Sequence, residues 1–163
     1  MSTLTQHKLL SLLDYDASTG DFRWRVSRGS VVAGGVAGSP HSRGYTSIRI
    51  DGRLYLAHRL AWLAVTGALP VDQLDHINGD KRDNRIANLR EASNQTNNQN
   101  YRKSKKNSKT GYLGVCHEPR GDSYVAYLRV DGKTRNLGTY KTPEEAHAVY
   151  VQAKRQLHEG CTL

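Results

Sequence analysis

Residues 74–100, LDHINGDKRDNRIANLREASNQTNNQN, constrain the fold of this chain more than any other stretch. Two short apolar runs enclose a loop rich in Asn, Asp and Gly, and the second of these runs covers residues 86–89. Ser93 then has the character of a helix N-cap, because its hydroxyl can accept a backbone N–H of the first turn. The pattern predicts a strand, a loop, a second strand and a helix, in that order.

Four polar residues lie within this frame. Asp75 and His76 belong to the first run, Asn88 to the second, and Asn97 to the predicted helix. A neutral His is a suitable general base near pH 7, and oxygen ligands suit a hard divalent cation. The frame can therefore hold a metal ion beside a base; the alternative is an Asn-rich surface loop beside a structural hairpin.

These residues resemble the HNH endonuclease family, which has the ββα-metal fold. His76 lies at the first His of the family motif, Asn88 at the central Asn, and Asn97 at the third position, where Asn replaces the second His. Homing-type members share that Asn variant. Asp75 before the His and the run NLR at residues 88–90 are also typical of them. The resemblance implies a metal-dependent DNA endonuclease of the homing or phage type.

The resemblance also implies a role for each of the four residues. His76 is expected to act as the general base, with Asp75 and Asn97 as metal ligands. Asn88 is expected to steady the hairpin and hold the main chain of His76. Two oxygen ligands favour Mg²⁺ or Mn²⁺ over zinc. Neighbours on a regular strand point to opposite faces, so Asp75 and His76 converge only if the strand ends or twists there.

Charge points to a nucleic acid partner. The 163 residues include 24 Lys+Arg against 15 Asp+Glu, a net charge of +9, which favours a polyanion such as double-stranded DNA. Residues 60–100 are slightly acidic, as a cation site needs, and basic segments flank them. An RNA-associated structural protein is a weaker alternative, since it rests on charge alone.

The sequence carries no sign of a membrane or secreted protein. It has no apolar run of about 18 residues, and its first residues include acidic side chains and no small-residue cleavage site. Cys116 and Cys161 form no Cys-x-x-Cys pair, so we expect no structural zinc. This cysteine pattern fits a protein of the reducing cytosol, and a disulfide between the two is the alternative. We expect a cytoplasmic monomer of a bacterial or phage-infected cell, because no coiled coil or symmetric interface is evident.

The N-terminal part is predicted to be β-rich. Residues 3–13 indicate a short amphipathic helix, residues 22–26 a strand, and Asp51-Gly52 a type I′ hairpin turn. Basic residues on these strands could face DNA, or form an ordinary solvated surface: Arg23, Arg25, Arg49 and Arg53.

A helix is predicted over residues 57–66, ended by Gly67. His58 opens this helix. We interpret it as a structural, hydrogen-bonded histidine, although the run HRLAW also occurs in the HNH family.

Residues 102–109 contain no apolar side chain and form a natural linker. A sequence-independent contact with the DNA backbone is expected there, although a charge run can also be merely solvated. The lysines concerned are Lys103, Lys105, Lys106 and Lys109.

From residue 111 the pattern changes to three strands and a helix. Thr142 and Pro143 start that helix, with Glu145 three residues after the cap. The text GYLGV…YVAYLRVDGKTRNLGTYKTPEEAHAVY resembles the plant Apetala-type DNA-binding domain over roughly residues 110–159. In that family the sheet lies in the major groove.

Alternation predicts which side of this sheet faces away from the helix. Val125, Tyr127 and Arg129 are expected to face outward, joined by Thr134 and Asn136 across the turn. All of these residues except Val125 are expected to contact DNA. The base-reading Arg residues of plant members are replaced by Leu113, Cys116 and Glu118, so the target sequence does not carry over.

The predicted class is α+β. Residues 1–56 form an N-terminal β-rich DNA-contacting segment, 57–101 the HNH nuclease core, 102–110 a basic linker, and 111–159 an Apetala-type domain with a three-stranded antiparallel sheet packed on one helix. The predicted function is DNA cleavage by phosphodiester hydrolysis, with nicking of one strand. The alternative is a sequence-specific DNA-binding regulator that does not cleave.

Overall fold

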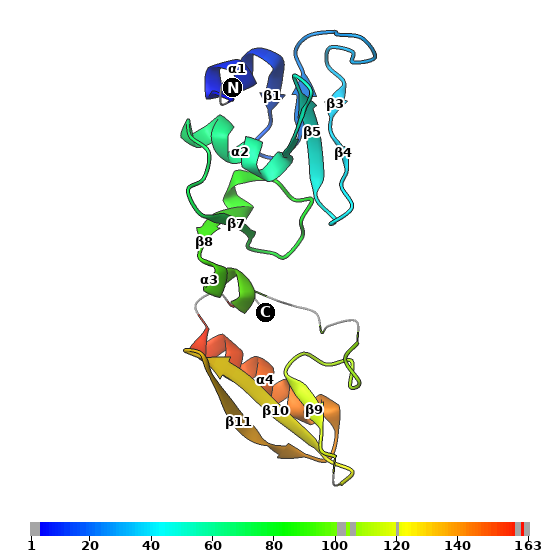
Figure 1. The fold of residues 1–163 in the computed structure, drawn as a ribbon, viewed down its shortest axis with the longest axis vertical. Coiled ribbons are helices and arrows are strands. Elements are labelled where there is room, and N and C mark those ends of the chain that lie inside the picture. The colour runs from blue at the N-terminus through cyan, green and yellow to red at the C-terminus, as the bar shows by residue number, and fades with distance from the viewer. Residues whose placement is uncertain (1–3, 101–103, 105–106, 120, 159–160, 162–163) are drawn as a thin grey trace. The chain divides into compact units, whose positions relative to one another are not determined.

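The computed structural model describes residues 4–100, 104, 107–119, 121–158 and 161. The chain divides into two compact units, Met1–Ser93 and Asn94–Leu163 (Figure 1). Within the described residues, the α+β class is confirmed by several small antiparallel sheets and four α-helices. No helix in these ranges is both long and apolar enough to cross a membrane.

The first unit contains two three-stranded sheets and one two-stranded sheet, in the orders β1-β2-β3, β4-β5-β6 and β7-β8. Its elements, in chain order, are α1 (Gln6–Leu12), β1 (Leu13–Tyr15), β2 (Phe22–Trp24), β3 (Val36–Ala37), β4 (Ser39–Pro40), β5 (Thr46–Ile50), β6 (Arg53–Leu56), α2 (Ala57–Thr66), β7 (Gln73–His76), the 3₁₀ helix η1 (Ile86–Asn88) and β8 (Leu89–Ala92).

One hydrophobic cluster joins the β-rich N-terminal residues to the helix and hairpin that follow them. Full burial of one Leu, Ile or Phe side chain contributes about 1.5–3 kcal/mol, so this shared core holds the unit together. The predicted N-terminal segment therefore supports the residues of the predicted motif directly. The largest members of the cluster are Leu9, Leu13, Phe22, Ile48, Leu60, Leu63 and Leu89.

Two local predictions are confirmed in this unit. Asp51 and Gly52 both have positive φ, 46° and 80°, as a type I′ turn requires between β5 and β6. Helix α2 has the predicted bounds and ends at Gly67, whose φ is 82° and whose N–H donates to the Leu63 carbonyl at 3.1 Å.

Two other predictions are wrong in their boundaries. The first helix starts after its N-cap Thr5 and ends at Leu12, because Leu13 turns into β1 and is buried there. The second strand of the motif is not at residues 86–89. Those residues begin with a 3₁₀ turn in which the Leu89 N–H donates to the Ile86 carbonyl, and the strand that pairs with β7 is β8.

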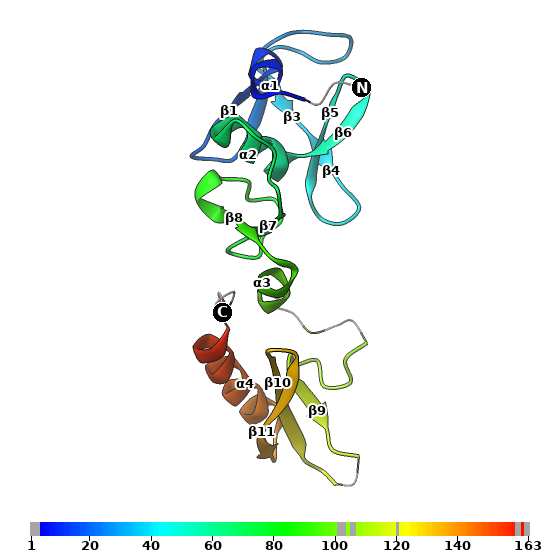
Figure 2. The same ribbon diagram turned by 60° about the vertical axis from the view of Figure 1, so that its left-hand side comes forward.

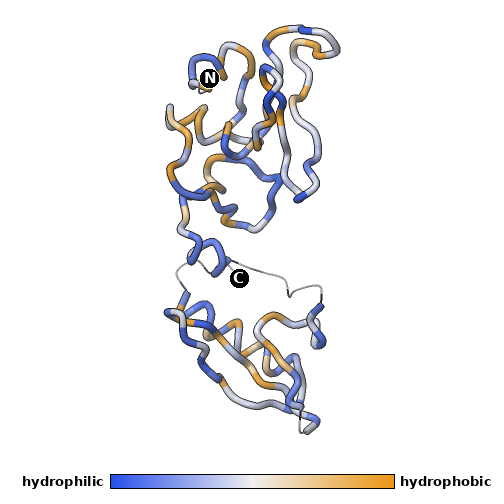
Figure 3. Tube along the Cα trace, viewed as in Figure 1, coloured by the Kyte–Doolittle hydropathy of each residue, from blue (hydrophilic) through white to orange (hydrophobic). Residues whose placement is uncertain are grey.

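The second unit contains a polar helix, α3 (Asn94–Gln99), and a three-stranded sheet in the order β11-β10-β9 with a long helix on it. Figure 3 shows α3 almost entirely in blue, since its residues are NQTNNQ. Helix α4 crosses one face of the sheet in Figures 1 and 2. The other bounds are β9 (Val115–His117), β10 (Tyr124–Val130), β11 (Lys133–Tyr140) and α4 (Pro143–Leu157).

Helix α4 begins as predicted. The Thr142 hydroxyl accepts the Glu145 N–H at 3.3 Å, the Glu145 carboxylate accepts the Thr142 N–H, and Pro143 occupies the first turn. Ala146 and Tyr150 of this helix pack on a buried cluster of the sheet. Helix α4 and the three strands thus share one buried cluster within the second unit.

Val125 was expected to face outward with Tyr127 and Arg129, and it lies outside the buried cluster that packs under α4; its exposed fraction is nevertheless only 2%. It lies in the central strand, opposite Cys116 of β9 and Thr139 of β11, and these neighbours flank it on both sides. A bulge follows, where the register between β10 and β11 shifts after Ala126.

Candidate functional site

The β7–β8 hairpin positions Asp75 and His76. Asp75 lies opposite Arg90, and His76 lies opposite Leu89. Because successive residues of a strand alternate, the two side chains leave opposite faces of the hairpin, and both are buried. The structure brings Asp75 together with Arg90, and His76 together with aromatic side chains of other elements.

Asp75 forms a buried ion pair. The Arg90 guanidinium donates to Oδ2 of Asp75 from Nη2 at 2.8 Å and from Nε at 3.1 Å. The exposed fractions of the two side chains are 7% for Asp75 and 27% for Arg90. A carboxylate so far removed from water requires a cation, and Arg90 is that cation.

His76 lies in a group of three rings. Its ring centroid is 5.1 Å from that of His58 on α2 and 6.0 Å from that of Tyr45, just before β5. The rings of Tyr45 and His58 are 5.0 Å apart, and the Lys81 ammonium lies 4.8 Å from the Tyr45 centroid. Burial lowers the pKa of His76, while the nearby Asn84 side chain and nearby carboxylates oppose that shift. The imidazole is therefore neutral at neutral pH, as a general base must be.

His58 was expected to be hydrogen-bonded, and for its Nδ1 this is wrong. That atom is buried and has no hydrogen-bond partner among the described residues. Burial lowers the pKa of His58 to about 3, with contributions from His76 and Arg59. His58 is thus a neutral ring that packs edge-on against His76 without charge repulsion.

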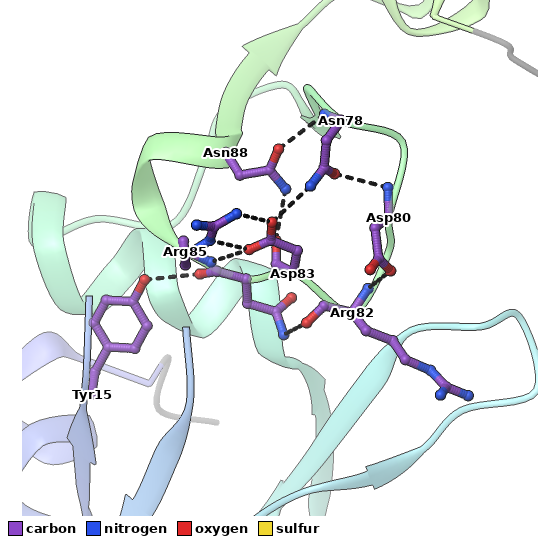
Figure 4. A network of polar contacts seen from close by, with 8 residues as sticks. Tyr15, Asn78, Asp80, Arg82, Asp83, Arg85 and Asn88 are labelled. Carbon is purple, nitrogen blue, oxygen red and sulfur yellow. Dashed lines mark hydrogen bonds and ion pairs between the residues drawn. The ribbon is translucent and has the colours of Figure 1, made fainter. Parts of the chain in front are cut away.

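Asn88 links the start and the end of the loop at residues 77–85, which is called the motif loop below. Its Oδ1 accepts the Asn78 N–H at 2.9 Å, its backbone carbonyl accepts the Ile77 N–H at 2.9 Å, and its Nδ2 donates to the Asp83 carbonyl at 2.8 Å. Ile77 and Asn78 directly follow His76, and Figure 4 shows the contacts of the Asn88 side chain with Asn78 and Asp83. These bonds support the steadying role predicted for Asn88 and leave its amide engaged within the loop.

The charged residues Asp83 and Arg85 add further hydrogen bonds within this loop. Asp83 accepts two hydrogen bonds from the Arg85 guanidinium, at 2.8 and 2.6 Å, and one from the Asn78 amide at 2.7 Å (Figure 4). The Arg85 hydrogen bond lowers the pKa of Asp83 to about 2. Asp83 therefore stays ionised at any pH at which cleavage would be measured.

The N-terminal residues support the same loop, which sequence reasoning missed. The Tyr15 hydroxyl donates to the Asn84 carbonyl at 2.8 Å, and the Asn84 amide donates to the Arg82 carbonyl at 3.0 Å. Gly20 lies so close to this loop that a Cβ there would be 2.5 Å from the backbone nitrogen of Arg85. In the sequence, the Gly of the DASTGD turn is the only local feature that indicates this close contact between the two backbone segments.

Gly20→Ala should destabilise the first unit by more than about 1 kcal/mol, because the new methyl would meet backbone atoms and φ is +82°. Gly34→Ala is the matched control: its φ is +81°, but a methyl group there would have nothing within 4 Å of it. Urea unfolding followed by the fluorescence of Trp24 and Trp62 measures both. Equal losses in the two variants would contradict the close approach.

The predicted DNA-contacting arginines of the first unit bond to the protein itself. Arg25 pairs with Asp14 at 2.6 Å, Arg23 donates to the Gly34 carbonyl at 3.1 Å, and Arg49 donates to the Gly52 carbonyl at 3.1 Å. On the β5–β6 hairpin, Arg49 lies opposite Leu54 and Arg53 lies opposite Ile50, so the two arginines leave different faces. Their contact with DNA stays a prediction.

The remaining predicted residues belong to the second unit. Asn97 lies on α3. Tyr127 pairs with Asn136 and Arg129 with Thr134, which places these four on the sheet face away from α4. Their role stays a prediction, as does that of the exposed Lys109. Three other lysines lie outside the described residues: Lys103, Lys105 and Lys106.

The expected metal ligands are one carboxylate and one amide oxygen. Among the described residues, no three His, Cys, Asp or Glu side chains gather into a group that could hold a metal ion. Asp75 fits a ligand role by its chemistry, because Mg²⁺ and Mn²⁺ prefer carboxylate oxygens. The part that Asn97 takes stays a prediction.

Comparison with known proteins supports the nuclease interpretation of the motif. Residues 55–99 match the family model of the HNH endonucleases, a segment that contains His76, Asn88 and Asn97. This match supports the resemblance to HNH endonucleases for these residues and a nuclease-type function, for which DNA is the substrate. Neither the curated proteins nor the solved structures gave a match to the chain.

Proposed function

We propose that the chain is a metal-dependent DNA endonuclease that hydrolyses one phosphodiester bond per encounter. The observation that carries the proposal is His76: a neutral, buried imidazole on β7, enclosed by two rings, within the segment that matches HNH endonucleases. General bases have these properties, since the ring must be both uncharged and fixed in orientation.

In this proposal His76 takes the proton from the attacking water. Asn88 and the Asp83–Arg85 pair keep the following loop rigid, so that the imidazole keeps its position relative to the phosphate. Asp75 and Asn97 would hold the metal ion. A bound Mg²⁺ or Mn²⁺ would supply charge stabilisation at the phosphate and at the leaving 3′ oxygen.

The second unit is proposed to read the DNA sequence. Its sheet face away from α4 carries Tyr127, Arg129, Thr134 and Asn136, side chains that can hydrogen-bond to DNA. The Apetala-type resemblance of residues 110–159 suggests that this face enters the major groove. Basic residues of the linker and of the first unit would contact phosphates irrespective of sequence.

Supercoiled plasmid tests the function directly. The protein should relax the plasmid in the presence of Mg²⁺ or Mn²⁺ and leave it intact in EDTA. Binding without cleavage in any metal would favour the second candidate, a DNA-binding regulator that does not cleave.

A plasmid time course should show nicked circles accumulating well before linear DNA appears. The chain carries one Asp75–His76 pair and one copy each of Asn88 and Asn97, so a monomer can attack one strand at a time. Quantifying the three plasmid forms on a gel measures the order of events. Linear product from the first time point, without a nicked intermediate, would contradict this prediction and indicate a symmetric dimer.

A further inference from the structure

Lys81 is an exposed lysine of the motif loop whose side chain is held by the turn between β4 and β5. Its ammonium donates to the Arg43 carbonyl at 3.2 Å and lies 4.8 Å from the centroid of the Tyr45 ring. Its stem passes Gly44, where an added Cβ would lie 3.7 Å from Cδ of Lys81. A long surface side chain ordinarily keeps its rotamer freedom, so these three contacts give the ammonium a defined position.

No carboxylate neutralises Lys81 among the residues that the structure describes. Two arginines of the same segment are neutralised: Arg85 pairs with Asp83 at 2.6 Å, and Arg90 pairs with Asp75 at 2.8 Å. An ammonium has three N–H donors, and a backbone carbonyl accepts one of those of Lys81. An aromatic ring attracts a cation without cancelling its charge. The side chain is therefore an ordered cation that can still donate to an anion.

Tyr45 connects this cation to the candidate base. The Tyr45 ring centroid is 6.0 Å from that of His76 and 5.0 Å from that of His58, so Lys81 and the two histidines lie around the same ring. A DNA strand carries one phosphate for about every 3.4 Å of helix axis, and a strand with one phosphate at His76 has others on either side of it. The ammonium of Lys81 is placed to meet such a neighbouring phosphate.

We propose that Lys81 binds a phosphate of the cleaved strand next to the one that is hydrolysed, and that Tyr45 is a positioning residue that holds the ammonium for this contact. The inference rests on the proposed function for the place of the strand. A lysine binds phosphate as a point charge and does not read sequence. Because the ammonium is already ordered, binding costs it little further rotamer freedom.

Binding without cleavage tests the phosphate contact. In gel shifts in EDTA on a linear duplex, Lys81→Met should bind about 10-fold more weakly than the wild-type protein. The slope of log K against log salt concentration should become less negative by about 0.9, the value for one lost phosphate contact. Lys8→Met makes the same change in net charge, but Lys8 pairs with Asp51 at 3.6 Å, so its slope should equal that of the wild type.

A single uncharged phosphate analogue locates the contact. Once the nicked position has been mapped, duplexes with one methylphosphonate beside it should bind the wild-type protein and Lys8→Met about 10-fold more weakly at one flanking position. Lys81→Met should be insensitive to that replacement, since the partner of the phosphate is already gone. Tyr45→Leu should lose part of the sensitivity, and Tyr45→Phe, which keeps the ring, should retain it.

In nicking assays, Lys81→Met should raise KM more than it lowers kcat, because a flanking phosphate is bound alike before and during hydrolysis. A lower kcat with an unchanged KM would place Lys81 at the hydrolysed phosphate and overturn the inference. A wild-type salt slope in Lys81→Met, or full methylphosphonate sensitivity in Lys81→Met or Tyr45→Leu, would also overturn it. If the wild-type protein bound DNA without cleaving it and Lys81→Met flattened the salt slope, the proposed function would fail and the phosphate contact of Lys81 would stand.

Discussion

His76→Ala is expected to lower the rate of plasmid nicking by about 10² to 10⁴-fold while leaving DNA binding close to wild type. The substitution removes the only imidazole that the proposal assigns to the attacking water. It leaves the basic residues that would bind phosphates in place. Nicking rates in Mg²⁺ and gel shifts in EDTA measure the two properties separately.

Two variants accompany this measurement. His76→Gln retains polar volume in a buried site, so it should also be inactive but better folded than His76→Ala. His7→Ala removes an exposed histidine of α1 in the same unit and should cleave at the wild-type rate. Cleavage by His76→Gln at that rate would show that His76 is not the base.

Local chemistry explains which elements could be predicted from the sequence. The Asp51-Gly52 turn, the Gly67 helix end and the Thr142 capping box each depend on two to four neighbouring residues. The strand predicted at residues 86–89 failed because Asn88 bonds to both ends of the loop and tightens its backbone into a 3₁₀ turn. The two-residue strands β3 and β4 have no periodicity that a sequence pattern could reveal.

The polar residues of the motif could be recognised in the sequence, but their surroundings could not. The contacts of Tyr45 and His58 with His76, and of Tyr15 with Asn84, join residues far apart in the chain. No spacing rule predicts such contacts, because they depend on how the N-terminal β-rich residues pack on α2 and on the motif loop. Asp75 lies opposite Arg90 because the second strand is β8, Leu89–Ala92, and the predicted strand at residues 86–89 did not include Arg90.

Arg90→Met is expected to destabilise the first unit by about 3–5 kcal/mol, because it removes the guanidinium that pairs with the buried Asp75 carboxylate. Adding Asp75→Asn to this variant should recover most of the loss, since the uncompensated charge is then gone. Urea unfolding followed by the fluorescence of Trp24 and Trp62, both in this unit, measures the single and double variants.

The exposed pair Arg25–Asp14 provides the matched control. Its atoms are closer, 2.6 Å against 2.8 Å for Arg90–Asp75, but its side chains are 53% and 58% exposed. Water already solvates both charges, so Arg25→Met should cost no more than about 1 kcal/mol. Burial, and not the shorter distance, is expected to decide which arginine matters. A loss at Arg90 as small as the loss at Arg25 would mean that Asp75 is hydrated in solution, and Arg90 would then not be required to keep its carboxylate in the fold.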